Sequence, residues 1–183
     1  LLVISPVRGQ VQEQHVTVDP GSVIRRLGGG VGASWHAMAI AHPLELEKYD
    51  YPVRLVNPRG SGYGGNPPLA DTTAWNQLKA HASWLGLDFL RVELSQRMYE
   101  PQRQVFDWEN EEMQALYRIL DWCEANGADV FLQQLWTDVE WNSWPGVHPL
   151  LSAPRSLDDF AEGIATLLQH LTVDRKYTCI KYF

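Results

Sequence analysis

The sequence predicts an α/β fold in which parallel strands alternate with helices. From residue 71 onward, segments with helical apolar spacing alternate with short, largely apolar segments that are typical of buried strands. The chain has 183 residues, the size of one domain or of part of a larger one. Strict alternation with long helices favours crossover connections between parallel strands, in either an open doubly wound sheet or an eight-stranded barrel.

The N-terminal part is predicted to be a short β segment, residues 1–22, ahead of the main domain, residues 23–183. The run His15–Asp19 alternates polar and apolar side chains, and Pro20 and Gly21 close it with a turn. Val23–Leu27 is predicted to be the first strand of the main domain. Prolines and glycines interrupt residues 41–70, which predicts a long connection.

Three helices are predicted from apolar spacing and from residues that begin or end helices. The first covers Asp71–Leu85 and stops at Gly86, and the second covers Asn110–Asn126. The third begins at Ser156, where Ser156 and Asp159 resemble a capping box with Asp in place of the usual Glu.

Three further strands are predicted at Leu87–Leu94, Asp129–Trp136 and Thr178–Phe183. In the first of these, alternation places Arg91 and Glu93 on the face opposite the leucines, near the carboxyl end of the strand. An Arg and a Glu cannot lie unpaired in a dry interior. Two interpretations follow: the pair is a plain ion pair, or at least one member faces a polar site at this strand end.

A second group of candidate residues follows the strand at Asp129–Trp136. Trp136, Trp141 and Trp144 lie within nine residues, among amide and carboxylate side chains. A sugar ring stacks its C–H face on an indole while its hydroxyl groups bond to such polar neighbours. The segment therefore predicts a carbohydrate site, and the alternative is a loop in which the tryptophans serve as packing.

Composition excludes several classes of function. Lys plus Arg number 15 and Asp plus Glu number 22, so a net charge of −7 argues against nucleic-acid or anionic-membrane partners. Cys123 and Cys179 are predicted to be buried thiols, and the scattered histidines predict no metal site. The stretch from Gly28 to Ala33 formally fits a dinucleotide fingerprint, but Pro43 cuts short the helix that it requires. No cofactor is expected.

Three stretches resemble the clan A retaining glycoside hydrolases, a (β/α)8 superfamily that includes cellulases, mannanases and β-glucosidases. Trp84–Val92 resembles the second helix–strand junction of that family, in which an Arg ends the strand. Phe106–Trp108 resembles the approach to the next helix, and Lys176–Phe183 resembles the fourth strand. The resemblance extends from about Val23 to Phe183, in matching order and spacing.

The resemblance implies the N-terminal half, about four βα units, of a (β/α)8 TIM barrel, with the short β segment ahead of it. An open parallel sheet is the alternative, and a 3-2-1-4 strand order would contradict the barrel. The family cleaves glycosides by double displacement, with two carboxyl groups about 5–5.5 Å apart. Both are expected beyond Phe183, so no acid/base or nucleophile is assigned here. We expect the rest of the barrel to come from further sequence, a second chain or self-association.

By the same resemblance, Arg91 corresponds to the Arg that orients the nucleophile. The function expected is retaining hydrolysis of a β-linked glycoside; the alternatives are a non-catalytic carbohydrate-binding barrel and an unrelated metal-dependent barrel enzyme. This substrate class favours a secreted or periplasmic location. The substrate-binding residues are expected to cluster at one end of the barrel: Trp35, His36, Arg91, Glu93, Gln134, Trp136, Asp138, Trp141 and Trp144.

Overall fold

The structure, a computed structural model, describes Asp19, Gly21 and residues 30–37 and 66–183. The strand predicted at Val23–Leu27, and the predicted segment 1–22 apart from Asp19 and Gly21, lie outside the described residues. The elements are, in chain order, β1 (Gly32–Ser34), α1 (Thr72–Leu85), β2 (Phe89–Ser95), α2 (Gln96–Tyr99), α3 (Glu111–Asn126), β3 (Asp129–Trp136), the 3-10 turns η2 (Glu140–Asn142) and η3 (Pro149–Leu151), α4 (Leu157–Gln169), the π-helical turn η4 (His170–Asp174) and β4 (Ile180–Tyr182).

The four strands form one parallel sheet in the order β1-β2-β3-β4. Each strand pairs with the next along the chain, which is the order of consecutive strands in a (β/α)8 barrel. The described strands therefore lack the 3-2-1-4 order of a doubly wound sheet. The fold is α/β with a four-stranded parallel sheet, and this arrangement is consistent with part of such a barrel.

The helix boundaries follow the signals in the sequence closely. The Asp71 side chain accepts a hydrogen bond from Ala74 N at 2.9 Å and begins α1, and Gly86 ends it in the left-handed conformation, with φ of 61°. Asn110 accepts bonds from the first turn of α3, and the Ser156 hydroxyl accepts one from Asp159 N at 3.2 Å at the start of α4. The predictions for these helix ends are confirmed.

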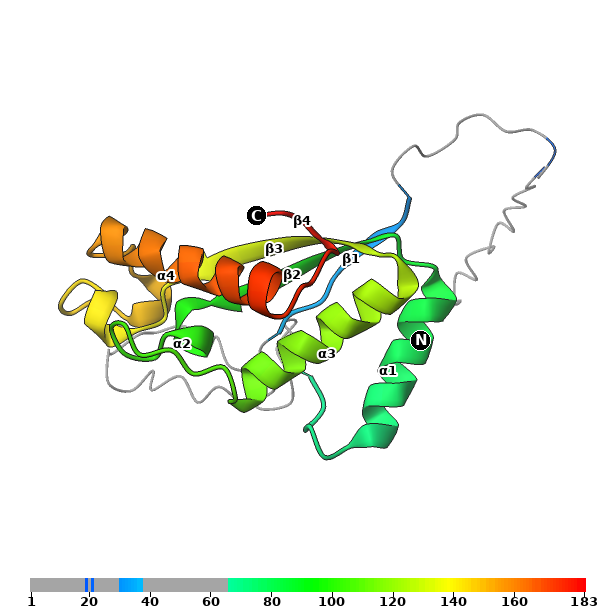
Figure 1. Cartoon of the computed structure of the whole chain (residues 1–183), viewed down its shortest axis with the longest axis horizontal. Coiled ribbons are helices and arrows are strands. Elements are labelled where there is room, and N and C mark those ends of the chain that lie inside the picture. The colour runs from blue at the N-terminus through cyan, green and yellow to red at the C-terminus, as the bar shows by residue number, and fades with distance from the viewer. Residues whose placement is uncertain (1–18, 20, 22–29, 38–65) are drawn as a thin grey trace, which may run out of the picture.

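The helices cover one face of the sheet. In Figure 1, α1 and α3 lie on the same side of the strands, and the other side carries no helix of the described chain. Leu90, Val92 and Leu94 of β2 are fully buried on the covered face, together with Val130 and Leu132 of β3. Because side chains alternate along a strand, the residues between them point to the open face.

The carboxyl end of α3 is bonded to the chain leading into β4. The Glu124 carboxylate accepts hydrogen bonds from Thr178 N at 3.0 Å, from the Thr178 hydroxyl and from Cys179 N at 2.9 Å. Cys123 and Cys179 are free and buried, as predicted, and burial raises the pKa of the Cys123 thiol to about 12. Within the described residues no helix is both long and apolar enough to cross a bilayer.

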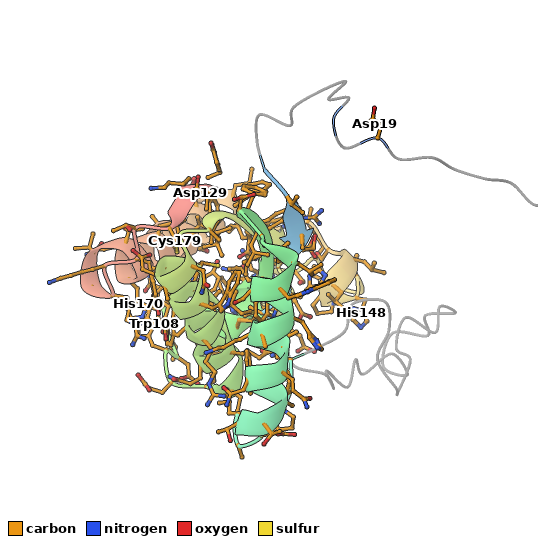
Figure 2. The ribbon with its side chains drawn as sticks, turned by 90° about the vertical axis from the view of Figure 1, so that its right-hand side faces the viewer. Asp19, Trp108, Asp129, His148, His170 and Cys179 are labelled. Carbon is orange, nitrogen blue, oxygen red and sulfur yellow. The ribbon has the colours of Figure 1, made fainter. Side chains whose placement is uncertain are left out.

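An aromatic stack connects the loop before α3 to the end of α4. The rings of Phe106 and Trp108 stack with centroids 5.3 Å apart, and the Trp108 indole stacks on the His170 imidazole at 4.1 Å. Figure 2 labels Trp108 and His170, which lie next to each other. The Tyr117 hydroxyl lies 2.9 Å from His170 Nε2. Burial lowers the pKa of His170 despite the neighbouring Asp174 carboxylate, which disfavours the charged imidazolium in this packing.

Candidate functional site

Three of the predicted site residues meet at the carboxyl ends of β1 and β2. Ser34 pairs with Arg91, and the backbone N–H of Ala37 donates to the Glu93 carbonyl at 3.1 Å, so His36 lies beside Glu93 on the open face. His36 Nδ1 is 2.6 Å from Glu93 Oε2, and Arg91 Nη2 contacts Glu93 Oε1. The Glu93 carboxylate thus bridges an imidazole and a guanidinium.

Of the three side chains in this cluster, that of Glu93 is the most buried. Its side chain is 1% exposed, whereas that of Arg91 is 42% exposed. A buried carboxylate needs partners, and here two polar side chains supply them. Arg91 Nε has no hydrogen-bond partner within the described residues. The ion pair predicted from the sequence therefore forms, and the buried Arg91 Nε donor lacks an acceptor in the described part of the chain.

The surroundings of His36 disfavour the charged imidazolium. Burial, and secondarily the positive charge of Arg91, lower the pKa of His36 below its ordinary value. Nδ1 is the ring nitrogen that lies next to the Glu93 carboxylate. In the neutral tautomer with its proton on Nδ1, the acceptor atom of the ring is Nε2.

Trp35 lies on the other face of the sheet from His36. Its side chain is 9% exposed, its ring is 5.9 Å from that of Trp122 in α3, and its Nε1 donates to Asn66 Oδ1 at 2.9 Å. Strand alternation forces this placement, because adjacent residues point to opposite faces. Asn66, which accepts from Trp35 Nε1, also donates to the His36 carbonyl at 2.9 Å, and Trp35 and His36 line one cavity, so the substrate role of Trp35 stays a prediction.

The carboxyl end of β3 contains an irregularity beside this cluster. Gln133 pairs with Glu93 and Gln134 pairs with Leu94, but the next pair joins Ser95 to Trp136, so one residue of β3 is extra. Gln134 therefore shares the face of Leu94 and is not brought together with Glu93. The Trp136 side chain lies outside the described part of the structure, and its substrate role stays a prediction.

Asp138 is held in a charge network at the start of the loop after β3. Its Oδ2 accepts a hydrogen bond from Arg97 Nε at 2.9 Å, and Arg97 Nη1 lies 2.8 Å from Glu112 Oε2. Asp138 is 7% exposed and has a positive φ of 50°. The network ties this loop to α2 and α3. Sequence reasoning missed Arg97, although an Arg two residues past a strand end was a visible signal.

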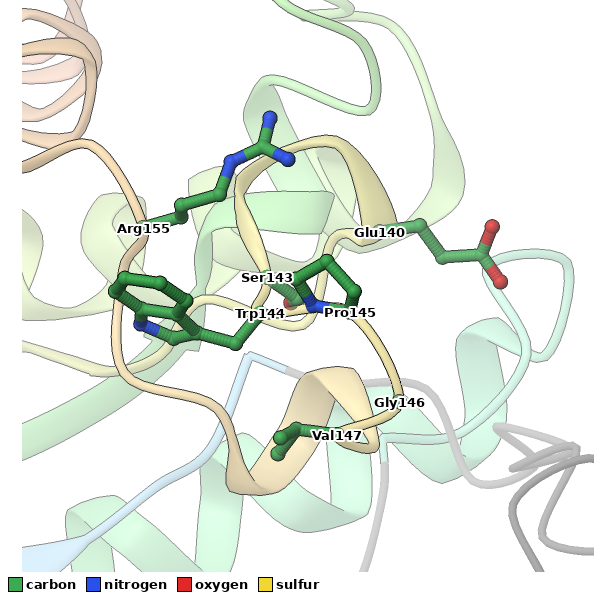
Figure 3. Close-up of a pocket in the computed structure, with 7 residues that line it drawn as sticks. All are labelled: Glu140, Ser143, Trp144, Pro145, Gly146, Val147 and Arg155. Atoms are coloured by element: carbon green, nitrogen blue, oxygen red, sulfur yellow. The ribbon is translucent and has the colours of Figure 1, made fainter.

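Trp141 and Trp144 differ in exposure. Trp141 is half-buried, and its Nε1 donates to the Glu100 carbonyl at 3.4 Å. Trp144 is 52% exposed and lines an open cavity of about 220 Å³ together with Glu140, Pro145 and Arg155 (Figure 3). Arg155 was not singled out from the sequence, because an Arg in a loop carries no distinctive pattern.

A second cavity of about 390 Å³ lies between β1 and α1, and its lining includes Trp35, His36 and Leu78. The described residues contain no group of three or more His, Cys, Asp or Glu side chains placed to hold a metal ion. Likewise, no helix begins within residues 30–37, where a dinucleotide fingerprint would need one; Gly32–Ser34 is a strand instead.

Comparisons with known proteins find a similarity in structure and none in sequence. No protein-family model matches the chain, and no curated protein sequence matches it. A solved structure of a family 39 glycoside hydrolase from the gut symbiont Bacteroides cellulosilyticus WH2 is similar over 64% of this chain, with a TM-score of 0.45 and 14% sequence identity. The similar region spans 22% of that hydrolase chain.

Proposed function

We propose that this protein is a retaining glycoside hydrolase that cleaves a β-linked glycoside by double displacement. The observation that carries the proposal is the cluster of His36, Arg91 and Glu93 at the carboxyl edge of consecutive parallel strands. Active sites of (β/α)8 enzymes lie at this edge. We further propose that the sheet is part of such a barrel, whose remaining strands contribute the two catalytic carboxylates.

Each member of the cluster has a role that follows from its chemistry. Arg91 donates hydrogen bonds, and its Nε is proposed to hold the nucleophilic carboxylate in its ionised form. Glu93 acts through its neighbours as a positioning residue, because its carboxylate is buried between Arg91 and His36. His36 Nε2 is proposed to accept a hydroxyl hydrogen of the sugar.

The proposal is tested by kinetics on a panel of aryl β-glycosides, with the protein assayed together with the sequence or chain that supplies the remaining strands and their two carboxylates. Arg91→Ala should lower kcat by about 100-fold with a smaller change in KM, since the lost donor acts on a charged carboxylate in the reaction. Arg91→Lys should recover part of this loss. Arg103→Ala is the matched control, because Arg103 forms an exposed ion pair with Asp159 away from the cluster.

Two results would oppose the proposal. Unchanged kcat in Arg91→Ala would remove Arg91 from the reaction. Sugar binding with no turnover of any aryl β-glycoside would favour a carbohydrate-binding barrel that lacks the catalytic carboxylates.

A further inference from the structure

Three consecutive residues ahead of β4 lie along the last turns of α3. The Tyr177 hydroxyl donates to Asp121 Oδ1 at 2.7 Å. About one turn further along the helix, Glu124 Oε2 accepts from Thr178 N at 3.0 Å and from Cys179 N at 2.9 Å. These bonds fix both the position and the direction of the chain where it passes α3.

This segment brings the Cys179 thiol to the helix turn that carries Cys123. Cys179 Sγ lies 3.8 Å from the Leu120 carbonyl oxygen. Cys123 comes one turn after Leu120 on α3, so the two residues share a face of the helix. Because helical side chains lean toward the N-terminus over the preceding turn, the Cys123 side chain points to the place where the Cys179 thiol lies.

The surroundings of the two thiols agree with this closeness. Burial, then the contact with Glu124, and then the nearby Cys123 thiol raise the pKa of Cys179. Both cysteines belong to one buried cluster, in which Cys123 is 0% exposed and Cys179 is 6% exposed. Both thiols are free, so the structure shows the reduced form of the pair.

We propose that Cys123 and Cys179 form a reversible disulfide that cross-links α3 to the chain entering β4 when the protein meets a low-molecular-weight disulfide such as oxidised glutathione. Cys179 reacts first, because its neighbour Thr178 is exposed whereas Cys123 is fully buried.

The reaction consists of two thiol–disulfide exchanges. The Cys179 thiolate attacks one glutathione sulfur, which forms a mixed disulfide and releases one glutathione thiolate. The Cys123 thiolate then attacks the Cys179 sulfur and releases the second glutathione thiolate. The protein loses two electrons and two protons, and oxidised glutathione takes up both as it becomes two thiols.

The cross-link acts on stability more than on shape. It closes a loop of about 57 residues that includes β3 and α4, and so it restricts the unfolded chain far more than the folded one. The reaction is slow, because the thiolate is the reacting form and burial holds both thiols protonated until this segment opens. We therefore expect oxidation over hours and a product that is more stable than the reduced protein.

The test is peptide mapping of the folded protein after incubation with oxidised glutathione at about pH 8. The protein is used together with the sequence or chain that supplies the remaining strands, and free thiols are blocked with N-ethylmaleimide before digestion. Trypsin places the two cysteines in separate peptides, Ile119–Arg155 and Tyr177–Lys181. The two should appear as one species, lighter by two hydrogens than their sum, which dithiothreitol separates.

The melting temperature provides a second readout. Oxidation should raise the Tm by about 5–15 °C. Cys123→Ala and Cys179→Ala are the matched controls, and each is compared with itself before and after incubation, so that any loss caused by the substitution cancels. Neither variant should give the linked species or gain Tm.

The proposal is overturned if the folded protein gives no linked species and the link appears only after unfolding in urea. It is also overturned if Cys179 retains glutathione without the link, or if the link forms and lowers the Tm. The inference does not depend on hydrolysis, so none of these results bears on the proposed function.

Discussion

Glu93 shows how a single buried charge organises the candidate site. A carboxylate that is 1% exposed would be strongly destabilising if it were alone, and His36 and Arg91 supply the compensation. The same contacts fix the orientation of the His36 and Arg91 side chains. Glu93 therefore contributes both to the stability of this sheet edge and to the geometry of the site.

The titration of His36 is the first prediction at this scale. Because burial and Arg91 oppose protonation, we expect the His36 pKa in the folded protein to lie below the ordinary value of about 6.5. With a depressed pKa, His36 binds a proton less tightly in the folded state than in the unfolded state. The free energy of unfolding therefore decreases as pH falls below about 6.5. NMR titration of the His36 ring, with the urea-unfolded chain as reference, measures this directly. A folded-state pKa at or above the unfolded value would contradict it.

Two glycines with similar backbone angles provide a second prediction. Gly30 and Gly86 have φ of 76° and 61°, but an added Cβ at Gly30 would lie 2.2 Å from an Asp88 oxygen, while at Gly86 it meets nothing within 4 Å. Gly86→Ala should therefore cost about 1 kcal/mol from backbone strain, and Gly30→Ala about 3 kcal/mol from strain plus the clash. Urea unfolding measures the free energy of unfolding of both variants. Equal decreases in the two variants would show that the Asp88 side chain moves aside without cost.

At the residue scale, the sequence predicted the contact between Arg91 and Glu93, but it did not predict the positions of the residues around that pair. Alternation along a clear strand placed that pair correctly. It gave no register for Trp35, because Gly32–Ser34 is a three-residue strand without an apolar signal. Asp138 was missed as a partner of Arg97, since their contact joins residues 41 positions apart.

At the scale of elements, the bonds of Glu124 to Thr178 and Cys179 attach α3 to the chain before β4. These bonds, first that from the Thr178 hydroxyl, lower the pKa of Glu124 below its ordinary value. A carboxylate with a depressed pKa stabilises the fold above its unfolded pKa of about 4.3 and loses that contribution as pH falls through the folded value. Glu124→Gln should thus lose about 1 kcal/mol at pH 7, a figure reduced for the exposure of the group.

Urea unfolding at pH 7 and at pH 3 checks this prediction, with Glu162→Gln as the control because Glu162 is an exposed helical residue on α4. The difference between Glu124→Gln and wild type should shrink toward pH 3. A difference that does not depend on pH would contradict the role given to the charge.

Helix ends were the most predictable elements. Asp71, Asn110 and Ser156 each use a side-chain oxygen to accept a backbone N–H of the first turn, and this local chemistry is visible in a few letters of sequence. α2 and the extra residue of β3 were not predicted, because both depend on how β2 and β3 meet. Local signals set where helices begin, and pairing between strands sets the shape of the site.

At the scale of the whole molecule, the alternation of strands and helices in the sequence predicted a parallel sheet with this strand order. That the sheet is part of a closed barrel is a proposal. Just after β1, the Trp35 and Ala37 amides donate to β2. Because successive amides of an extended chain point to opposite edges, the amide of Ser34, next to Trp35, points to the outer edge of the sheet. If β1 pairs with another strand in a closed barrel, the Ser34 amide should exchange with solvent as slowly as that of Trp35. Hydrogen exchange measured by NMR tests this, with the exposed Gly146 as a fast reference. Fast exchange at Ser34 would contradict closure at this edge.

The measurement that tests the central claim most directly is the anomeric configuration of the first sugar released from a β-linked pentaose by the protein together with the sequence or chain that supplies the remaining strands. Double displacement inverts the anomeric carbon twice, so the product should appear first as the β-anomer and then mutarotate. Proton NMR recorded during the first minutes of cleavage distinguishes the two anomers. Early accumulation of the β-anomer is the predicted result. Early accumulation of the α-anomer, or no cleavage of cellopentaose, xylopentaose or mannopentaose, would contradict the account.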